Sequence, residues 1–413
     1  MAYMDDRKLG KLNWPLIILV VIIASLGVWN LQSAGRSLAS QPWIMQAKAL
    51  SLGVLAISIF LFFDYRILRS LAWPIYLATL GLLVFVHLKG ATHKGAQRWI
   101  HVGPVSLQPS EFAKISVVLM LARFFSDHPV DDRIVRRPGT FTRIRDWFRQ
   151  QGVTIGAWYR NALVVPPPPM RPTKSTRVSG YSLSELWWPA LILFVPVIIV
   201  IKQPDLGTGL VTLAIGGSVI LFAGLTSGTL ATLFTAGVTA VFLGWKYALK
   251  PYQRDRVEMF LDPEKDAMHK GYHAIQSLIA VGSGRTWGKG WGNGTQNQLS
   301  FLPEQHTDFA FPVWAEEHGF VGSVVLIGLF MLLVMVALDM AAHARDRFGA
   351  YLAFGAAALF FWHAFINIAM VIGLLPVVGV PLILVSYGGS SAVLTMLTIG
   401  VLMNVSMRRS QYQ

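Results

Sequence analysis

Long apolar runs restrict the folds that this chain can adopt more than any other feature of its sequence. One of them, VGSVVLIGLFMLLVMVAL, extends from Val321 to Leu338 without a charged residue. A helix needs about 20 such residues to cross the hydrocarbon core of a bilayer. Hydrophobic residues make up 54% of the 413 residues, and charged residues only 14%. The chain is therefore predicted to be an all-α polytopic membrane protein, with a single integral-membrane domain over residues 1–413.

The positions of these runs predict about ten transmembrane helices. A large extracytoplasmic loop, residues 251–311, is expected between the seventh and eighth helices. The first run is too long for the apolar part of a signal peptide, so we expect it to remain as a helix. Cysteine is absent, which excludes disulfides and cysteine-ligated metals. The expected spans lie at about residues 15–34, 49–63, 71–86, 112–125, 187–201, 207–224, 230–249, 312–339, 351–374 and 381–407.

Basic residues predict the orientation of the helices. Arg and Lys precede the first run, occur in the short loops after the second and eighth runs, and follow the last run. Because cytoplasmic loops carry an excess of Arg and Lys, both termini are predicted to be cytoplasmic. The net charge of +14 is therefore interpreted as a topology signal, and no nucleic-acid partner is expected.

A basic, proline-rich insertion separates the fourth and fifth spans. It covers residues 126–185, contains PPPPMRP, and carries more Arg than acidic residues. The same charge rule predicts that it is cytoplasmic. A partly disordered loop, with an amphipathic piece near RIRDWFRQ on anionic lipid, is favoured over an inserted soluble domain because apolar residues are few.

The stretch from Trp291 to Phe320 is the most polar region that directly adjoins an apolar run. Such a density of polar side chains at a membrane boundary indicates water or a polar ligand. Asp308 lies just before the eighth span and close to His306, where its carboxylate can act as a general base. An equally weighted alternative is that Asp308 or Thr307 is the N-cap of that helix.

Several other polar or aromatic residues near the ends of spans have structural explanations. Glu111 and Lys114 are three positions apart on one predicted helix, which favours an ion pair. Asp205 lies in QPDLGTG at a break between two helices, where it can cap the next helix or line a cavity. Trp99 and Trp291 fit the belt of aromatic residues found at membrane interfaces.

The loop 251–311 is unusually basic for a segment outside the membrane. It contains Arg254 and Arg256, and further along Arg285 and Lys289. As a group, these cations favour an anionic ligand such as a phosphate. Any single one of them is better explained by pairing with an acidic residue of the same loop.

Seven blocks of sequence resemble the signatures of the SEDS family (shape, elongation, division and sporulation). Their order and spacing cover nearly the whole membrane portion, and the combination is far more specific than any single block. GTQNQLSFLPEQHTDF and the opening YMDDRKLGKLNW are more similar to elongation-type than to division-type members, whereas the long insertion departs from the usual short connection. The blocks are GAQRW (95–99), QPSEFAK (108–114), QPDLGTG (203–209), GYHAIQS (271–277), GSG (282–284), FLPEQHTDFAF (301–311) and LPVVGVPLILVSYGGSS (375–391).

The resemblance implies a peptidoglycan glycosyltransferase that polymerises lipid II, a sugar donor carried on undecaprenyl pyrophosphate. Its fold would be a bundle of the SEDS type, and its site would lie on the outer face of the bacterial cytoplasmic (inner) membrane. The implied partner is a class B penicillin-binding protein, a transpeptidase. Asp308 would be the essential acid, and Glu111, Lys114 and Asp205 would support the site. The candidate substrate-binding residues are Trp99, Arg98, Gln108, Arg254, Arg256, Gln298, Glu304 and His306.

One carboxylate suits the chemistry that the resemblance implies. A sugar hydroxyl is a poor nucleophile, so a base must take its proton as it attacks the anomeric carbon. A single displacement with inversion then converts the α-linked donor into a β-1,4-linked product. The charge on the leaving pyrophosphate can be met by Arg and Lys, or by a divalent cation such as Mg²⁺ or Mn²⁺. The sequence does not separate these two solutions, so no cofactor is certain.

Two other function classes stay open. A flippase that moves lipid II needs ionisable or polar residues in the middle of its spans, and His363 and Asn367 are the main ones here. A non-catalytic scaffold for a penicillin-binding protein predicts that Asp308 is dispensable. The concentration of polar residues on one face of the membrane favours an enzyme over a transporter.

Overall fold

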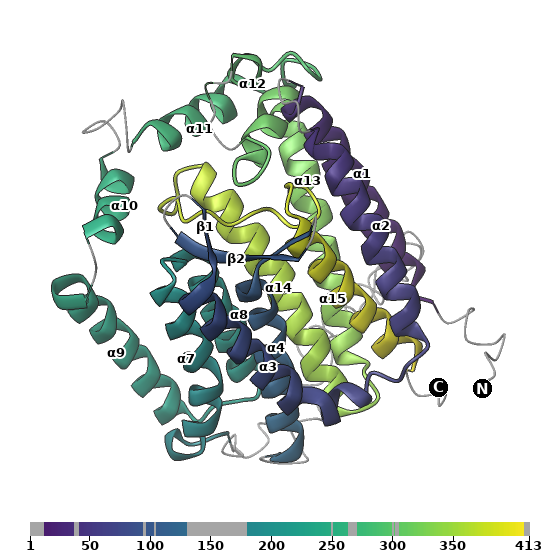
Figure 1. Ribbon diagram of the computed structural model, residues 1–413, viewed down its shortest axis with the longest axis vertical. Helices are drawn as coiled ribbons and strands as arrows, with labels where there is room; N and C mark the ends of the chain where they lie inside the picture. The colour runs from purple at the N-terminus through teal and green to yellow at the C-terminus, as the bar shows by residue number, and fades with distance from the viewer. Residues whose placement is uncertain are drawn as a thin grey trace, which may run out of the picture.

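The computed structural model describes residues 12–36, 41–93, 96–102, 105–129, 180–248, 251–262, 271–299, 301 and 305–408. Helices dominate these residues, as predicted for an all-α membrane protein (Figure 1). Most of the 126–185 insertion lies outside them. The long helices that they contain are α1 (Trp14–Ala34), α2 (Pro42–Leu61), α3 (Ile67–Lys89), α4 (Pro109–Asp127), α7 (Trp187–Lys202), α8 (Leu206–Phe222), α9 (Ser227–Leu243), α13 (Ala310–Ala342), α14 (Arg347–Val371) and α15 (Gly389–Met407).

These helices correspond one to one with the predicted spans. Within the described residues, seven helical segments are long and apolar enough to cross a membrane, namely α1, α2, α3, α9 with the π-helical turn after it, α13, α14 and α15. α7 and α8 are shorter apolar helices. α4 completes the set, and its polarity comes from residues such as Glu111 and Lys114 near its first turn.

Two predicted helix starts differ most from the structure. α2 starts at Pro42 instead of residue 49, and α15 starts at Gly389 instead of residue 381. Residues 372–388 are not helical because Pro376 and Pro381 lack the N–H groups that a helix requires. The backbone of this segment is satisfied in other ways, since Leu382 donates its N–H to Ser386 Oγ at 2.9 Å. We call residues 372–388 the crossing segment.

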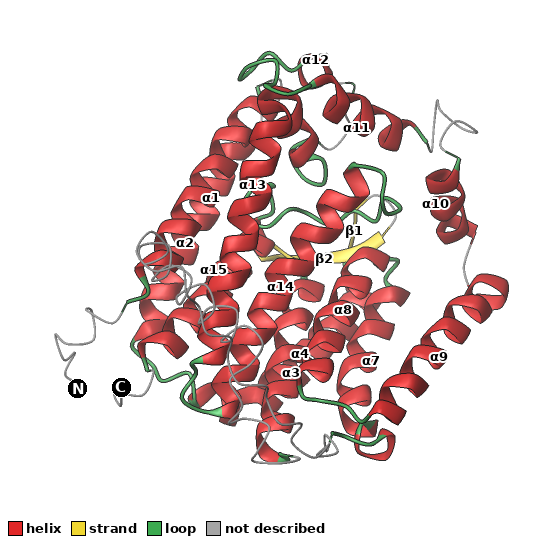
Figure 2. Ribbon diagram, turned by 180° about the vertical axis from the view of Figure 1, so that it is seen from behind, coloured by secondary structure: helices red, strands yellow, loops and turns green. Residues whose placement is uncertain are grey.

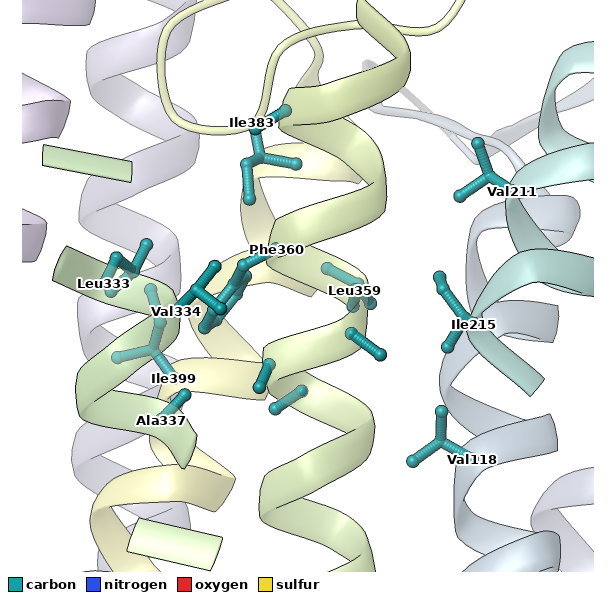
Figure 3. Packing of buried hydrophobic residues seen from close by; sticks show 14 of the residues in the cluster. Val118, Val211, Ile215, Leu333, Val334, Ala337, Leu359, Phe360, Ile383 and Ile399 are labelled. Carbon is teal, nitrogen blue, oxygen red and sulfur yellow. The ribbon is translucent and has the colours of Figure 1, made fainter. Parts of the chain in front are cut away.

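α14 is at the centre of the bundle. Figure 3 shows its side chains Leu359 and Phe360 between Val334 of α13 on one side and Ile215 of α8 on the other. Small buried residues such as Ala356 let the neighbouring helices approach closely. In the most apolar window of α14, 72% of the residues are buried, against 6% in α9. α9 therefore lies at the periphery, as Figure 1 also shows, and presents its side chains to the surroundings.

Short elements cover one end of the bundle (Figure 2). They are the helices α10 (Pro251–Leu261), α11 (Tyr272–Ser283) and α12 (Thr295–Gln298), and an antiparallel sheet of β1 (Ala91–His93), β2 (Ala96–Val102) and β3 (Val105–Leu107). The sheet was not predicted, although AQRWIHV is rich in the β-branched and aromatic residues that favour strands. β2 packs on α3 and α4, and so brings Arg98 and Trp99 over the ends of these helices. We call this the loop-covered end.

The opposite end of the bundle is fastened by buried polar residues. Tyr65 is fully buried, and its hydroxyl donates to Asp346 Oδ2 at 2.9 Å. Burial, reinforced by the negative charge of Asp346, raises the pKa of Tyr65 to about 12, so the phenol stays protonated and remains a donor. Asn404 of α15 donates its amide to the carbonyls of Phe60 and Phe63, at 3.1 and 2.8 Å.

Candidate active site

Asp308 lies at the loop-covered end, just before α13. Its backbone carbonyl accepts a hydrogen bond from Asn367 Nδ2 of α14 at 2.9 Å. Its carboxylate faces Gly379 of the crossing segment, because a Cβ added at Gly379 would lie 3.2 Å from Asp308 Oδ2. Gly379 has a φ of +72°, a conformation that favours glycine. The carboxylate therefore packs against bare backbone, and it is half-buried.

α13 begins too late for Asp308 to be its N-cap. The N-cap residue is Phe309, which makes no side-chain cap hydrogen bond. An N-cap carboxylate would instead accept from the N–H groups of the first helical turn. The predicted N-cap position, Thr307 or Asp308, is thus wrong, whereas the role of Asp308 as a general base stays a prediction.

Arg256 is the predicted basic residue that the structure brings to the crossing segment. It lies on α10, and its Nη1 donates to the carbonyl of Val378 at 3.4 Å. Val378 directly precedes Gly379, so the guanidinium reaches the same short piece of backbone as the Asp308 carboxylate. Arg254 bonds elsewhere, with its Nη2 donating to Lys246 O at 3.1 Å.

The residues before Asp308 are tied to other parts of the fold. The carbonyl of His306 accepts from Tyr387 N at 2.8 Å, and the two rings are 6.0 Å apart. Gln305 donates its side-chain amide to Ala34 O of α1 at 2.9 Å. Gln298 instead bonds within its own loop, to Gly292 O at 2.5 Å. Glu304 lies outside the described residues.

A second polar cluster joins the sheet, α4 and α8 around Asp205. The predicted cap is confirmed, since Asp205 Oδ1 accepts from Thr208 N at 3.3 Å. Gln108 Nε2 donates to Asp205 Oδ2 at 3.0 Å. Arg98 Nη1 lies 3.7 Å from Asp205 Oδ1, and its Nε donates to Gln203 O at 3.2 Å. Trp99, half-buried, follows Arg98 on β2 and pairs with Ala91 of β1.

The crossing segment brings these two clusters together. The carbonyl of Val378 would lie 2.4 Å from a Cβ added at Gly207, so the first turn of α8 packs directly against it. The same carbonyl accepts from Arg256. Asp308 and Arg256 therefore both lie near Val378 and Gly379 of the crossing segment. The first turn of α8, which follows Asp205, packs against Val378 as well. Gln298 is a predicted site residue whose hydrogen bond stays within its own loop.

Glu111 and Lys114 form the predicted ion pair. Lys114 Nζ lies 2.7 Å from Glu111 Oε1, and the side chains are only 1% and 5% exposed. Lys114 Nζ also lies 2.8 Å from His363 Nε2 of α14. A buried lysine with two partners is far less costly than an unpaired one, so these contacts stabilise the buried start of α4.

The burial of Glu316 and Glu317 and the partners of these two residues were not predicted. Glu316 Oε1 accepts from Lys289 Nζ at 2.7 Å and from Gln296 N at 3.2 Å, and Glu317 accepts from Ser33 Oγ of α1. The contacts of Glu316 hold α12 and the loop that precedes it against α13, and the contact of Glu317 joins α13 to α1. Two adjacent glutamates at the start of an apolar helix were a usable signal, since buried acids require partners. Lys289 is therefore engaged within the protein.

The α13 helix bends at Gly319, directly after this acidic pair. Gly319 has a φ of +67°, and a Cβ there would lie 2.3 Å from Gly288 N. Only glycine permits this approach of the loop to the helix. The kink lets residues 310–318 turn over the loop-covered end, so it helps to place Asp308.

A metal site finds little support among these groups. Within the described residues, no three His, Asp or Glu side chains lie close enough together to hold a metal ion. A divalent cation would therefore take most of its ligands from a phosphate of the substrate. A half-buried carboxylate and a guanidinium that reach neighbouring residues of the crossing segment, Gly379 and Val378, suit proton transfer near an anionic group.

Comparisons with known proteins find similarity along nearly the whole chain. The FTSW_RODA_SPOVE family model, described as "Cell cycle protein", matches residues 9–163 and 170–411. Peptidoglycan glycosyltransferase MrdB of Escherichia coli strain K12 is 36% identical over 410 residues, which cover 99% of this chain and 96% of that protein.

Two solved structures are similar along nearly their full length. The first is described as "structural coordination of polymerization and crosslinking by a peptidoglycan synthase complex". It has a TM-score of 0.74 and 31% identity, and the match covers 97% of this chain and 99% of that one. The second is the rod shape determining protein RodA of Thermus thermophilus. Its TM-score is 0.63 at 27% identity, with 97% and 98% of the two chains covered.

Proposed function

The chain belongs to the FtsW/RodA/SpoVE family of cell cycle proteins, and we propose that it is a peptidoglycan glycosyltransferase that polymerises lipid II into β-1,4-linked glycan strands. The name of the Escherichia coli relative, peptidoglycan glycosyltransferase MrdB, supports this activity. A role in cell elongation and shape is supported by the likeness to a rod shape determining protein.

The observation that carries the proposal is the contact between Asp308 and Gly379. The carboxylate faces backbone that bears no side chain, so a substrate hydroxyl can approach it without a steric barrier from that residue. The carbonyl of the same aspartate is fixed by Asn367, which restricts the motion of the group. A general base requires both a defined position and access to its proton donor.

In the proposed reaction, the acceptor hydroxyl oxygen attacks the anomeric carbon of the donor sugar. Asp308 takes the hydroxyl proton, a new C–O bond forms, and the bond to the pyrophosphate breaks with its electron pair. Undecaprenyl pyrophosphate then leaves with the developing negative charge. Arg256, close to the crossing segment, supplies a fixed positive charge for it. A divalent cation bound to the pyrophosphate would add to this effect, and chelation with EDTA tests for it.

The proposed setting is the bacterial inner membrane, with both termini cytoplasmic and the loop-covered end outside. Lipid II polymerisation requires the sugar donor on the outer face, which fits the side on which Asp308 would then lie. A class B penicillin-binding protein is the proposed partner, because one of the similar solved structures belongs to a peptidoglycan synthase complex with coordinated polymerization and crosslinking.

The transporter alternative finds less support. A lipid II flippase would need polar groups in the middle of its spans that are available to the moving head group. His363 and Asn367 are such residues, but both ring nitrogens of His363 and Nδ2 of Asn367 are engaged by main-chain carbonyls and Lys114.

Lipid II polymerisation by purified protein, alone and with the partner transpeptidase, tests the proposal. Asp308→Asn keeps the size of the side chain but removes the base, so we expect the rate to fall by roughly 100-fold or more. The matched control is Asp346→Asn at the opposite end of the bundle, where Asn can still cap α14. This control should polymerise at a near wild-type rate.

Two results would contradict the assignment. If Asp308→Asn folds, binds its partner and polymerises at a rate close to wild type, Asp308 is not the base, and Glu304 and Glu316 become the next candidates. If the wild-type protein polymerises nothing with or without the partner, the scaffold alternative is favoured over the enzyme.

A further inference from the structure

Two polar residues in the C-terminal half of α14 contact the crossing segment. His363 and Asn367 are one helical turn apart and are 1% and 0% exposed. A histidine and an asparagine in an apolar helix are costly unless they are hydrogen-bonded, so their contacts reveal what they do. Both contact main-chain carbonyls of the same short stretch, Val380 and Pro381.

The Asn367 side chain bridges two segments that are far apart in the sequence. Its Nδ2 donates to Asp308 O at 2.9 Å and to Val380 O at 2.6 Å. Because both partners are carbonyl oxygens, the amide must present its nitrogen, and a flipped amide would place three oxygens together. Both N–H groups are thus used, which fixes the orientation of the amide.

The two carbonyls that Asn367 holds belong to the two sides of the candidate site. Asp308 provides the carboxylate, and Val380 follows Gly379, the residue against which that carboxylate packs. We infer that Asn367 is a positioning residue: it clamps Asp308 to the crossing segment and so sets the direction of the carboxylate. The inference rests on the proposed function, and it identifies which mid-span residue serves that function.

His363 holds the neighbouring carbonyl in the same way. Its Nδ1 lies 3.3 Å from Pro381 O, which can only accept, so Nδ1 carries the proton and Nε2 accepts from Lys114 at 2.8 Å. Lys114 in turn donates to Glu111. The ion pair of α4 is therefore connected, through His363, to the stretch of crossing segment that Asn367 holds.

Replacement of the clamp should impair catalysis more than substrate binding. In Asn367→Ala, both carbonyls lose their donor, and the carboxylate loses its fixed direction. A displacement of about 1 Å costs roughly 100-fold in rate, so we expect kcat for lipid II polymerisation to fall by that order with a small change in KM. Asn367→Ser, which keeps one donor, should give an intermediate rate and serves if the alanine variant folds poorly.

A double variant separates positioning from a general loss of stability. If Asn367 acts through Asp308, adding Asn367→Ala to Asp308→Asn should lower the rate no further. Independent effects would multiply instead. The matched control is Asn404→Ala, which removes an equally buried amide that bridges Phe60 O and Phe63 O at the opposite end. It should lower thermal stability but leave the rate per folded molecule unchanged.

The outcomes distinguish the inference from the proposed function. Full loss of activity in Asp308→Asn together with a wild-type kcat in folded Asn367→Ala or Asn367→Ser would overturn the clamp and leave the function intact. A multiplicative loss in the double variant would also overturn it. A wild-type rate in Asp308→Asn would instead overturn the catalytic assignment on which the clamp rests.

Discussion

At the scale of single residues, the candidate site places the carboxylate of Asp308 opposite a residue without a side chain, Gly379. Asp308 is held by its carbonyl, and Gly379 has both a positive φ and a close approach to Asp308 Oδ2. Two separate constraints, the positive φ and the nearby carboxylate oxygen, therefore favour glycine at this position. A methyl group at this position would strain the backbone and occupy the space next to the carboxylate.

This leads to a prediction for Gly379→Ala. We expect polymerisation of lipid II to fall by at least about tenfold, because the added methyl displaces Asp308 or blocks the substrate hydroxyl. The control is Gly217→Ala on α8, where an added Cβ meets no atom within 4 Å. An active Gly379→Ala protein with the wild-type KM would show that the space beside Asp308 is not used by substrate.

At the scale of secondary structure elements, the loop-covered end is fastened to the bundle by buried charge. Glu316 is fully buried, and its Oε1 accepts from Lys289, Thr295 and Gln296, which hold α12 against the kinked start of α13. Asp308 lies just before the start of this helix. The fastening therefore stabilises the loop and, through α13, the position of the site.

Lys289→Ala tests this fastening. The substitution leaves the buried Glu316 carboxylate without its cation, which should destabilise the loop locally by roughly 1–3 kcal/mol. Hydrogen exchange of the amides in residues 284–299 measures the local opening. Lys202→Ala, which removes an exposed cation, is the control. Equal exchange in both variants would mean that the pair contributes nothing to holding the loop.

At the scale of the whole molecule, the bundle is built around α14 and leaves α9 at its edge. The central helix α14 carries the buried polar residues His363 and Asn367, whereas the peripheral helix α9 exposes large apolar side chains such as Phe234, which suits contact with lipid. This arrangement agrees with a multi-pass membrane protein whose chemistry is confined to one end.

The orientation of that end can be measured with single cysteines, since the native chain has none. Trp287 of the loop-covered end is 78% exposed, and Ser184 near the opposite end is exposed as well. An impermeant thiol reagent should label Trp287→Cys in intact spheroplasts, and Ser184→Cys only after lysis. Labelling of Ser184→Cys alone in intact cells would reverse the proposed orientation.

The sequence by itself determined the number and the approximate positions of the membrane helices. Hydrophobicity is a property of consecutive residues, so an apolar run such as Val321 to Leu338 is recognised without knowledge of its neighbours. The Glu111–Lys114 pair and the Asp205 cap were equally predictable, because both partners lie within one helical turn. Asp308 was recognised as a candidate, but its two explanations could not be separated.

Only the tertiary structure decided which distant groups meet. Asn367 contacts Asp308 and Val380, and Glu317 contacts Ser33, across separations that no periodicity in the sequence records. The crossing segment also escaped prediction, because its apolar residues resemble a helix until the prolines and the tertiary hydrogen bonds are considered together. The physical reason is burial. A polar group inside the bundle needs a hydrogen-bond partner, and the packing of the helices determines which distant residue is close enough to provide one.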